Sequence, residues 1–195
     1  MPKQVDHDER RRLIADAVCA LIDEQGLEAA TLRDVAARAD VSMGAVQRCF
    51  RTKGEMLQFA LAHIGHQVTT RAHARLRAAP AQSPASTVGH LAHEIALLKT
   101  RHRAQARTWL AFLAAAAVDP ALAAGLRTSY TDLETLLTDL IADAVDTPDP
   151  AHHAHTLLAL TDGLTAHVLI GQRTPDEAEH LLHTHLSRLW AHPGE

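Results

Sequence analysis

The chain of 195 residues is long enough for one domain with a sizeable core, or for a small domain joined to a larger one. Apolar residues make up 47% of it but aromatic residues only 3%, and the excess is Ala and Leu, which favour helices. We therefore expect an all-α protein of about nine helices. The formal net charge of -4 is uneven, since residues 1–56 sum to about -1, residues 57–107 to about +6 and residues 108–195 to about -9. This distribution argues against the last, acidic part as a DNA surface.

Neither a membrane partner nor secretion is expected. No apolar stretch approaches the roughly 20 residues that a membrane span needs, and no basic segment near the N-terminus precedes an uninterrupted apolar run. Two cysteines, Cys19 and Cys49, are too few for a disulfide framework, and both lie in apolar helical patterns. A reducing, cytoplasmic location fits best.

The first helix signal runs from Glu9 to Gln25, where apolar residues recur with helical spacing and Gly26 follows as a terminator. Thr31 and Asp34 then form a capping box, in which the threonine hydroxyl accepts from open backbone amides and the carboxylate reaches back. A second, short helix is expected to run to about Ala39.

Asp40-Val41-Ser42 interrupts this pattern, and Ser42 can cap a third short helix whose buried side is formed by Val46 and Phe50. Thr52-Lys53-Gly54-Glu55 is a further capping box and opens a long fourth helix. After a loop at residues 80–87, helices are expected at roughly residues 87–99 and 103–118. The last three helices begin where proline follows a capping residue: Asp119-Pro120, Asp149-Pro150 and Thr174-Pro175.

The second and third expected helices are both short and only about three residues apart, so they must cross at a steep angle. That geometry pushes the third helix outward, where it can enter a DNA major groove. With Val46 and Phe50 turned inward, the residues that stay exposed are Ser42, Met43, Gly44, Gln47 and Arg48.

These exposed residue types suit the reading of bases. Gln47 can pair with adenine and Arg48 with guanine in bidentate fashion, while Met43 can contact a thymine methyl group. Gly44 lets the backbone come close to the duplex. Phosphate contacts are expected from residues at helix termini, where amides and basic groups gather: Thr31, Arg33, Arg51, Thr52 and Lys53.

The run from Thr31 to Leu57, TLRDVAARADVSMGAVQRCFRTKGEML, closely resembles the DNA-binding domain of the tetracycline-repressor (TetR) family, and the resemblance covers about residues 9–60. Gly26, Phe50 and Lys53 match the family's pattern. The departures are Leu21-Ile22 in place of an aromatic residue, Gln47 in place of Tyr, and Cys49 in place of Tyr or His. Because the family's Tyr mostly holds a phosphate, Gln47 either turns this position toward base reading or weakens the anchoring of the backbone.

The resemblance implies a DNA-binding transcriptional regulator, a repressor that a small-molecule effector releases from double-stranded operator DNA. Residues 1–56 would be the helix-turn-helix domain and residues 57–195 the effector-binding and dimerisation domain. Family members pair through their last two helices. The pattern of this chain agrees, since residues 150–171 are apolar on several sides and residues 175–190 carry one apolar stripe. A homodimer through the last two helices is therefore expected.

The effector pocket is expected around residues 102–116, where one helix face combines polar groups with aromatic rings. The candidates are His102, Gln105, Trp109 and Phe112, with Asp162 as a further polar contact because it lies in an apolar run. The alternative is core packing of Trp109 and Phe112 beside a solvated His102.

The tail from Leu157 to Trp190 loosely resembles the C-terminal domain of betaine-regulator-like members of the family, whose ligands include quaternary amines. Three Phe, one Tyr and two Trp are too few and too scattered in this chain to form an aromatic cage. That ligand class is therefore not carried over.

The histidines of the chain point to one alternative function. Of 15 histidines, 14 lie after residue 62, and four pairs have i, i+3 spacing, so a metal-sensing regulator is an alternative. The pairs are His63/His66, His90/His93, His152/His155 and His180/His183. No pair comes with a thiolate or a suitably placed acidic ligand, and we expect neither metal nor cofactor. The chain contains no G-x-S-x-G, G-x-G-x-x-G or H-E-x-x-H motif, which argues against an enzyme. A helical interaction module would have no use for Lys53 and Arg33 framing Gln47 and Arg48.

Overall fold

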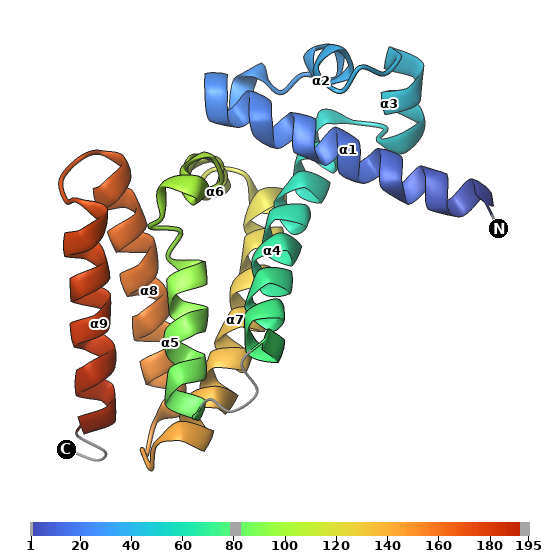
Figure 1. Cartoon of the computed structure of the whole chain (residues 1–195). Helices are drawn as coiled ribbons and strands as arrows, with labels where there is room; N and C mark the ends of the chain where they lie inside the picture. The colour runs from blue at the N-terminus through green and yellow to red at the C-terminus, as the bar shows by residue number, and fades with distance from the viewer. Residues whose placement is uncertain (1, 79–82, 192–195) are drawn as a thin grey trace. The chain divides into compact units, whose positions relative to one another are not determined.

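A computed structural model describes residues 2–78 and 83–191, and these residues are all-helical (Figure 1). They contain nine α-helices: α1 (Pro2–Gln25), α2 (Leu32–Arg38), α3 (Met43–Cys49), α4 (Lys53–Ala78), α5 (Pro84–Ile95), α6 (Arg103–Ala116), α7 (Pro120–Ala144), α8 (Pro150–Leu169) and α9 (Pro175–Ala191). Two short 3₁₀ helices, η1 (Leu27–Ala29) and η2 (Thr100–His102), complete the list. The expected all-α class and the expected number of helices are confirmed. In the described part of the chain, every helix is too short or too polar to cross a membrane.

The helices form two compact units. The first comprises the residues up to 66 together with residues 107–128, and the second comprises residues 67–106 together with those from 129 onward. These units are defined by packing, and their bounds differ from the division between residues 56 and 57 that we expect from function. That functional division stays a prediction.

The first unit contains α1, α2 and α3, which pack against one another. Gly26 ends α1 with a φ of 85°, a left-handed conformation that glycine adopts without a steric penalty. Asp40 takes a φ of 53° after α2, and the Val41 amide donates to the Ala36 carbonyl at 3.0 Å across the same turn. The chain therefore reverses sharply between α2 and α3, as a helix-turn-helix requires.

The second unit contains α5, α8 and α9, which pack against one another and lie side by side in Figure 1. Its core is built from aliphatic side chains of these helices and of α7, including Leu91, Leu137, Leu157 and Leu182, each at most 1% exposed. Inside it, the Thr165 hydroxyl donates to the Ala96 carbonyl at 2.6 Å, which ties α8 to the end of α5.

The helix starts follow the predicted caps with two differences in detail. Thr174 and Glu177 form a complete capping box, with the Glu177 amide donating to the threonine hydroxyl and the Thr174 amide to the carboxylate. The Glu55 carboxylate instead accepts from the Arg51 amide at 2.8 Å, one residue before the expected partner. The Asp34 carboxylate accepts from the Thr31 hydroxyl at 2.5 Å rather than from the Thr31 amide, which donates to Ala29.

Three predicted boundaries were wrong. α1 begins at Pro2 rather than Glu9, because apolar periodicity marks only the part of a helix that packs and not where the helix ends. Ser83 caps α5, so residues 84–87 are helical and not part of a loop, while residues 79–82 lie outside the described residues. α5 ends at Ile95, and its expected last turn is replaced by an irregular segment in which Leu97 takes a φ of 50°.

Candidate nucleic-acid interface and effector site

One side of α3 is buried and the other is exposed. Val46 is fully buried and Phe50, which caps the helix, is 1% exposed, so these two side chains turn inward as expected. Ser42, Gln47 and Arg48 are exposed on the opposite side. α3 therefore presents a polar flank of the kind that reads base edges.

Two further residues of this flank differ in their exposure. The Met43 side chain is 39% exposed, and Gly44 is partly buried. A Cβ atom at Gly44 would lie 3.6 Å from the Arg48 Nη1 atom, so the guanidinium group lies back along the helix over this glycine. In the first turn of α3, Met43 is therefore exposed, whereas Gly44 is covered in part by Arg48.

The candidate phosphate-binding residues lie at helix ends in the same unit. Arg33 and Arg51 are exposed, and so are Thr31 and Thr52, whose hydroxyl oxygens cap α2 and α4. Ser42 caps α3 in the same way, accepting from the Ala45 amide at 3.2 Å. These hydroxyl groups fix the starts of the helices that would face DNA.

The side chain of Lys53 is paired with Glu28 of the same chain. Its Nζ atom lies 3.3 Å from the Glu28 carboxylate and 3.3 Å from the Glu28 carbonyl oxygen, and the carboxyl group is exposed. An exposed pair of this kind contributes little to stability. Sequence reasoning missed Glu28 because a partner 25 residues away carries no local signal.

Two residues that position α3 were also missed. The Arg11 guanidinium of α1 lies 4.9 Å from the centre of the Phe50 ring and 4.3 Å from that of Phe59 in α4, and the two rings are 5.4 Å apart. Cation–π contacts of this geometry are worth about 0.5–1 kcal/mol each. Arg11 and Phe59 therefore hold Phe50, the residue that caps the end of α3, against α1 and α4.

The expected effector residues are divided between the two units. Trp109 and Phe112 belong to the first unit, where Phe112 is fully buried. Asp162 belongs to the second unit and accepts a hydrogen bond from the Tyr130 hydroxyl. His102, in η2, is not solvated as the alternative reading had it, since it is 5% exposed.

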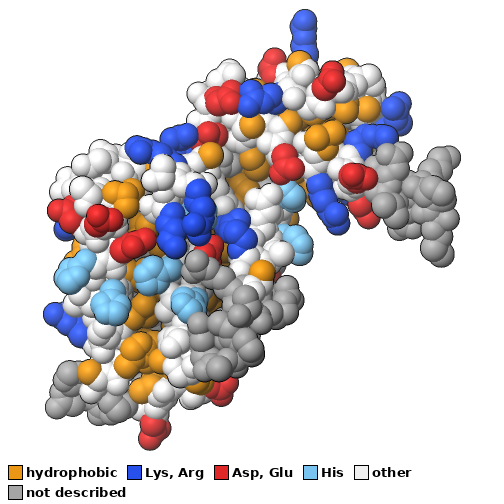
Figure 2. Space-filling model, viewed as in Figure 1, with side chains coloured by type: hydrophobic (Ala, Val, Ile, Leu, Met, Phe, Trp, Pro, Cys, Tyr) orange, Lys and Arg blue, Asp and Glu red, His pale blue; other side chains and the backbone are white. Residues whose placement is uncertain are grey.

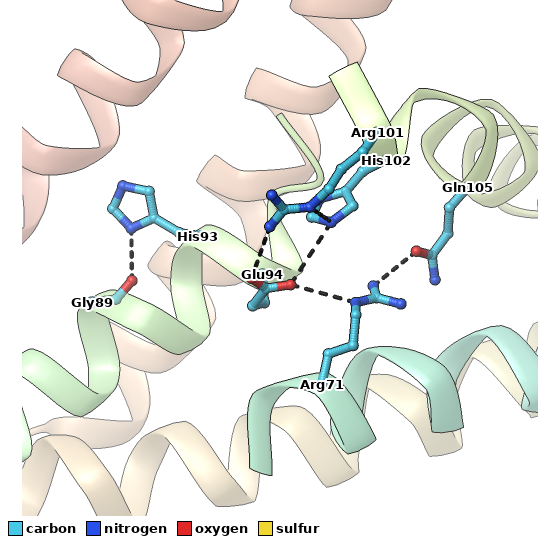
Figure 3. A network of polar contacts seen from close by, with 7 residues as sticks. All are labelled: Arg71, Gly89, His93, Glu94, Arg101, His102 and Gln105. Atoms are coloured by element: carbon cyan, nitrogen blue, oxygen red, sulfur yellow. Dashed lines mark hydrogen bonds and ion pairs between the residues drawn. The ribbon is translucent and has the colours of Figure 1, made fainter. Parts of the chain in front are cut away.

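His102 and Gln105 share a polar network with three residues that sequence reasoning missed (Figure 3). Glu94 of α5 is 2% exposed, and its carboxylate lies 3.4 Å from Arg71, 3.8 Å from Arg101 and 3.9 Å from His102. Arg71 also donates to the Gln105 Oε1 atom at 2.8 Å. The signal for Glu94 was present in the sequence, because it is a lone carboxylate on the apolar face of α5.

The histidine pairs do not build a larger ligand set in the described residues, where no three His, Cys, Asp or Glu side chains gather closely enough to hold a metal ion. Several histidine side chains lie on one face of the second unit in Figure 2. His63 contacts Asp16 at 2.9 Å and His155 contacts Glu134 at 3.3 Å.

Family models match both parts of the chain. The model of bacterial regulatory proteins of the tetR family matches residues 14–59, and that of the C-terminal part of BetI-type transcriptional repressors matches residues 84–191. The chain belongs to the TetR family. It is a DNA-binding transcriptional regulator and not an enzyme, with a BetI-type C-terminal domain.

Relatives of known sequence and structure agree with this membership. The TetR-family chain is 31% identical over 180 residues to the regulator PksA of Bacillus subtilis, covering 87% of this chain and 83% of PksA. It is also 31% identical to BetI 2 of Chromohalobacter salexigens, over 100% of this chain and 95% of that protein. A regulator from Rhodococcus sp. Rha1 has the same fold, with a TM-score of 0.82 at 30% identity over 92% and 95% of the two chains. A regulator from Saccharomonospora viridis, solved in complex with choline, has a TM-score of 0.81 at 21% identity over 92% and 96%.

Proposed function

We propose that this chain represses transcription by occupying a near-palindromic operator as a homodimer. The observation that carries the proposal is the polarity of α3, whose buried Val46 and Phe50 leave Gln47 and Arg48 facing outward. Two such helices, one turn of DNA apart, would enter successive major grooves at a spacing of roughly 34–36 Å. Gln47 and Arg48 then read bases, while Arg33, Arg51 and Lys53 hold phosphates. A regulator with this task acts in the cytoplasm.

The proposed dimer interface is formed by α8 and α9. In one protomer these helices pack on each other and on α5, yet Leu181 of α9 remains 38% exposed. A four-helix bundle made with the same helices of a second copy would cover this leucine. Symmetric pairing also gives each operator half-site one recognition helix.

Release from DNA is proposed to follow the binding of a small molecule to the BetI-type domain. His102 and Gln105 are the proposed polar contacts, with Asp162 of the same unit as a further candidate. Trp109 and Phe112, which belong to the other unit, stay predictions from the sequence. An effector needs only a few kcal/mol of differential affinity between the two dimer arrangements to shift the equilibrium.

A gel shift with the full-length chain and the DNA upstream of its own gene tests the proposal. We expect a retarded band that unlabelled fragment abolishes and a shuffled fragment of equal composition does not. Size-exclusion chromatography with light scattering on the same sample should give the mass of a dimer. If the protein is a monomer and retards no genomic fragment, both proposals, operator binding and dimer formation, are wrong.

A further inference from the structure

The network around Glu94 contains two buried hydrogen-bond donors with no acceptor in the part of the protein that the structure describes. They are the Nδ1 atom of His102 and the Nε2 atom of Gln105. Buried polar atoms are almost always paired, so two orphans in one network need an explanation.

The hydrogen bonds around them define both atoms as donors. The His102 Nε2 atom accepts from the Arg101 Nε–H group at 3.1 Å, so the neutral ring carries its hydrogen on Nδ1. The Gln105 Oε1 atom accepts from Arg71 at 2.8 Å, which identifies Nε2 as the amide nitrogen that carries two hydrogens. Burial, the largest cause, lowers the pKa of His102 and keeps its ring neutral near pH 7.

The charges around the donors favour an anion. Glu94 is buried and its carboxylate lies close to the guanidinium groups of Arg71 and Arg101. Two arginines against one carboxylate leave a net positive charge, and Lys99 lies close enough to lower the pKa of His102 as well. All these groups belong to the segment of residues 57–107, whose charge sums to about +6. A cationic ligand would meet repulsion from both guanidinium groups.

We propose that the effector of this regulator is an organic carboxylate, bound at the network of Arg71, Glu94, His102 and Gln105. The carboxylate oxygens accept from the His102 Nδ1–H group and the Gln105 amide, and the excess of arginine balances the added charge. The ligand therefore differs in charge from choline, which the Saccharomonospora viridis regulator binds in its solved complex. The inference rests on the proposed function only where it links ligand binding to the release of DNA.

The test compares ligands that match in size and differ in charge. Linear carboxylates from acetate to decanoate and alkyltrimethylammonium ions of equal length are titrated into the full-length protein, with inorganic phosphate as a third arm. Thermal unfolding reports binding without DNA, and a gel shift reports release from the upstream fragment. We expect saturable stabilisation by carboxylates above a minimum length, and release of DNA at the same concentrations.

The matched variants are Gln105→Glu and Arg103→Gln. The first keeps the oxygen that accepts from Arg71 but replaces the donor with a like charge, so carboxylate affinity should fall about tenfold or more. The second lowers the net charge by the same amount at an exposed position of α6 and should change carboxylate affinity less than about twofold.

Several results would overturn the assignment: stabilisation by the ammonium ions or by phosphate but not by carboxylates, no stabilisation by any arm, or an equal carboxylate response in Gln105→Glu. If no ligand stabilises the protein, water satisfies the His102 Nδ1–H group and the Gln105 amide. Carboxylate binding by a protein that ignores DNA would refute the proposed function and leave the ligand class standing. If the protein binds DNA but no carboxylate, the ligand class is refuted and the proposed function stands.

Discussion

At the scale of single residues, Lys53 is a candidate phosphate contact that the free protein holds against Glu28 at 3.3 Å. Lys53→Ala should weaken binding to every DNA sequence alike and reduce the slope of log K against log salt by about one unit. Glu28→Gln removes the charge that pairs with the lysine but keeps the Glu28 carbonyl contact, and it should leave that slope unchanged and tighten binding slightly. Fluorescence anisotropy over a salt series measures both slopes. An unchanged slope in Lys53→Ala would count against the phosphate contact.

Gln47 is exposed on the same flank of α3 as Arg48. If its amide pairs with an adenine, Gln47→Ala should lose about 1–3 kcal/mol of discrimination at one operator position and little elsewhere. Binding to a set of operators with single base changes measures this preference. Equal losses on all of them would show that Gln47 contacts the DNA backbone instead.

His102 makes the stability of the protein depend on pH. Burial lowers its pKa most, the Glu94 charge opposes that shift, and the charges of Arg71 and Arg101 add to it. Because the unfolded chain then binds a proton at a higher pH than the folded one, stability is lost as the pH falls below about 6.5 toward the lowered pKa. Urea unfolding between pH 7.5 and 5 should give a shallower fall for His102→Asn than for the wild type. The exposed His180→Asn serves as control, and identical curves for wild type and His102→Asn would contradict the assignment.

At the scale of helices, Ser42 combines two roles, since it caps α3 through the Ala45 amide and faces outward. Ser42→Ala should cost about 1 kcal/mol of unfolding free energy, because it removes the cap. Ser42→Asp retains a capping oxygen but adds a negative charge where DNA phosphates would lie. It should therefore keep the stability and weaken DNA binding. Denaturant titrations and gel shifts on both variants separate the two roles, and full DNA binding by Ser42→Asp would place this residue away from the duplex.

α3 has only seven residues, so its position depends on its neighbours more than on its own propensity. The Phe50 ring at its end is enclosed by Arg11 and Phe59, and the turn before it is shaped by the left-handed Asp40. The recognition helix is thus anchored at both ends by contacts outside itself.

At the scale of the whole molecule, the proposed dimer makes Leu181 of α9 an interface residue that is 38% exposed in the single protomer. Leu181→Asp should shift the protein toward the monomer and weaken binding to a full palindrome far more than to a half-site. Val118→Asp is the control, because Val118 is 88% exposed between α6 and α7. Sedimentation velocity measures the shift, and a dimer that persists in Leu181→Asp would direct the search to another face.

The helices and the orientation of the recognition helix could be predicted from the sequence because their determinants act over a few residues. Gly26 ends α1, Ser42 caps α3, and the spacing of Val46 and Phe50 assigns the buried side. The helix end, the cap and the buried side each depend on residues within one or two helical turns. The local sequence is therefore enough to predict them.

The Glu94 network and the support of Phe50 were decided by the tertiary structure. Arg71 and Gln105 are 34 residues apart in the chain, and the Lys53 contact with Glu28 spans 25. Helical periodicity identifies which side of a helix is apolar, but it does not say which helix will lie against that side. Sequence alone therefore identified a DNA-binding regulator, whereas only packing brought Arg71, Glu94, His102 and Gln105 together, because contacts between distant helices depend on how whole faces fit.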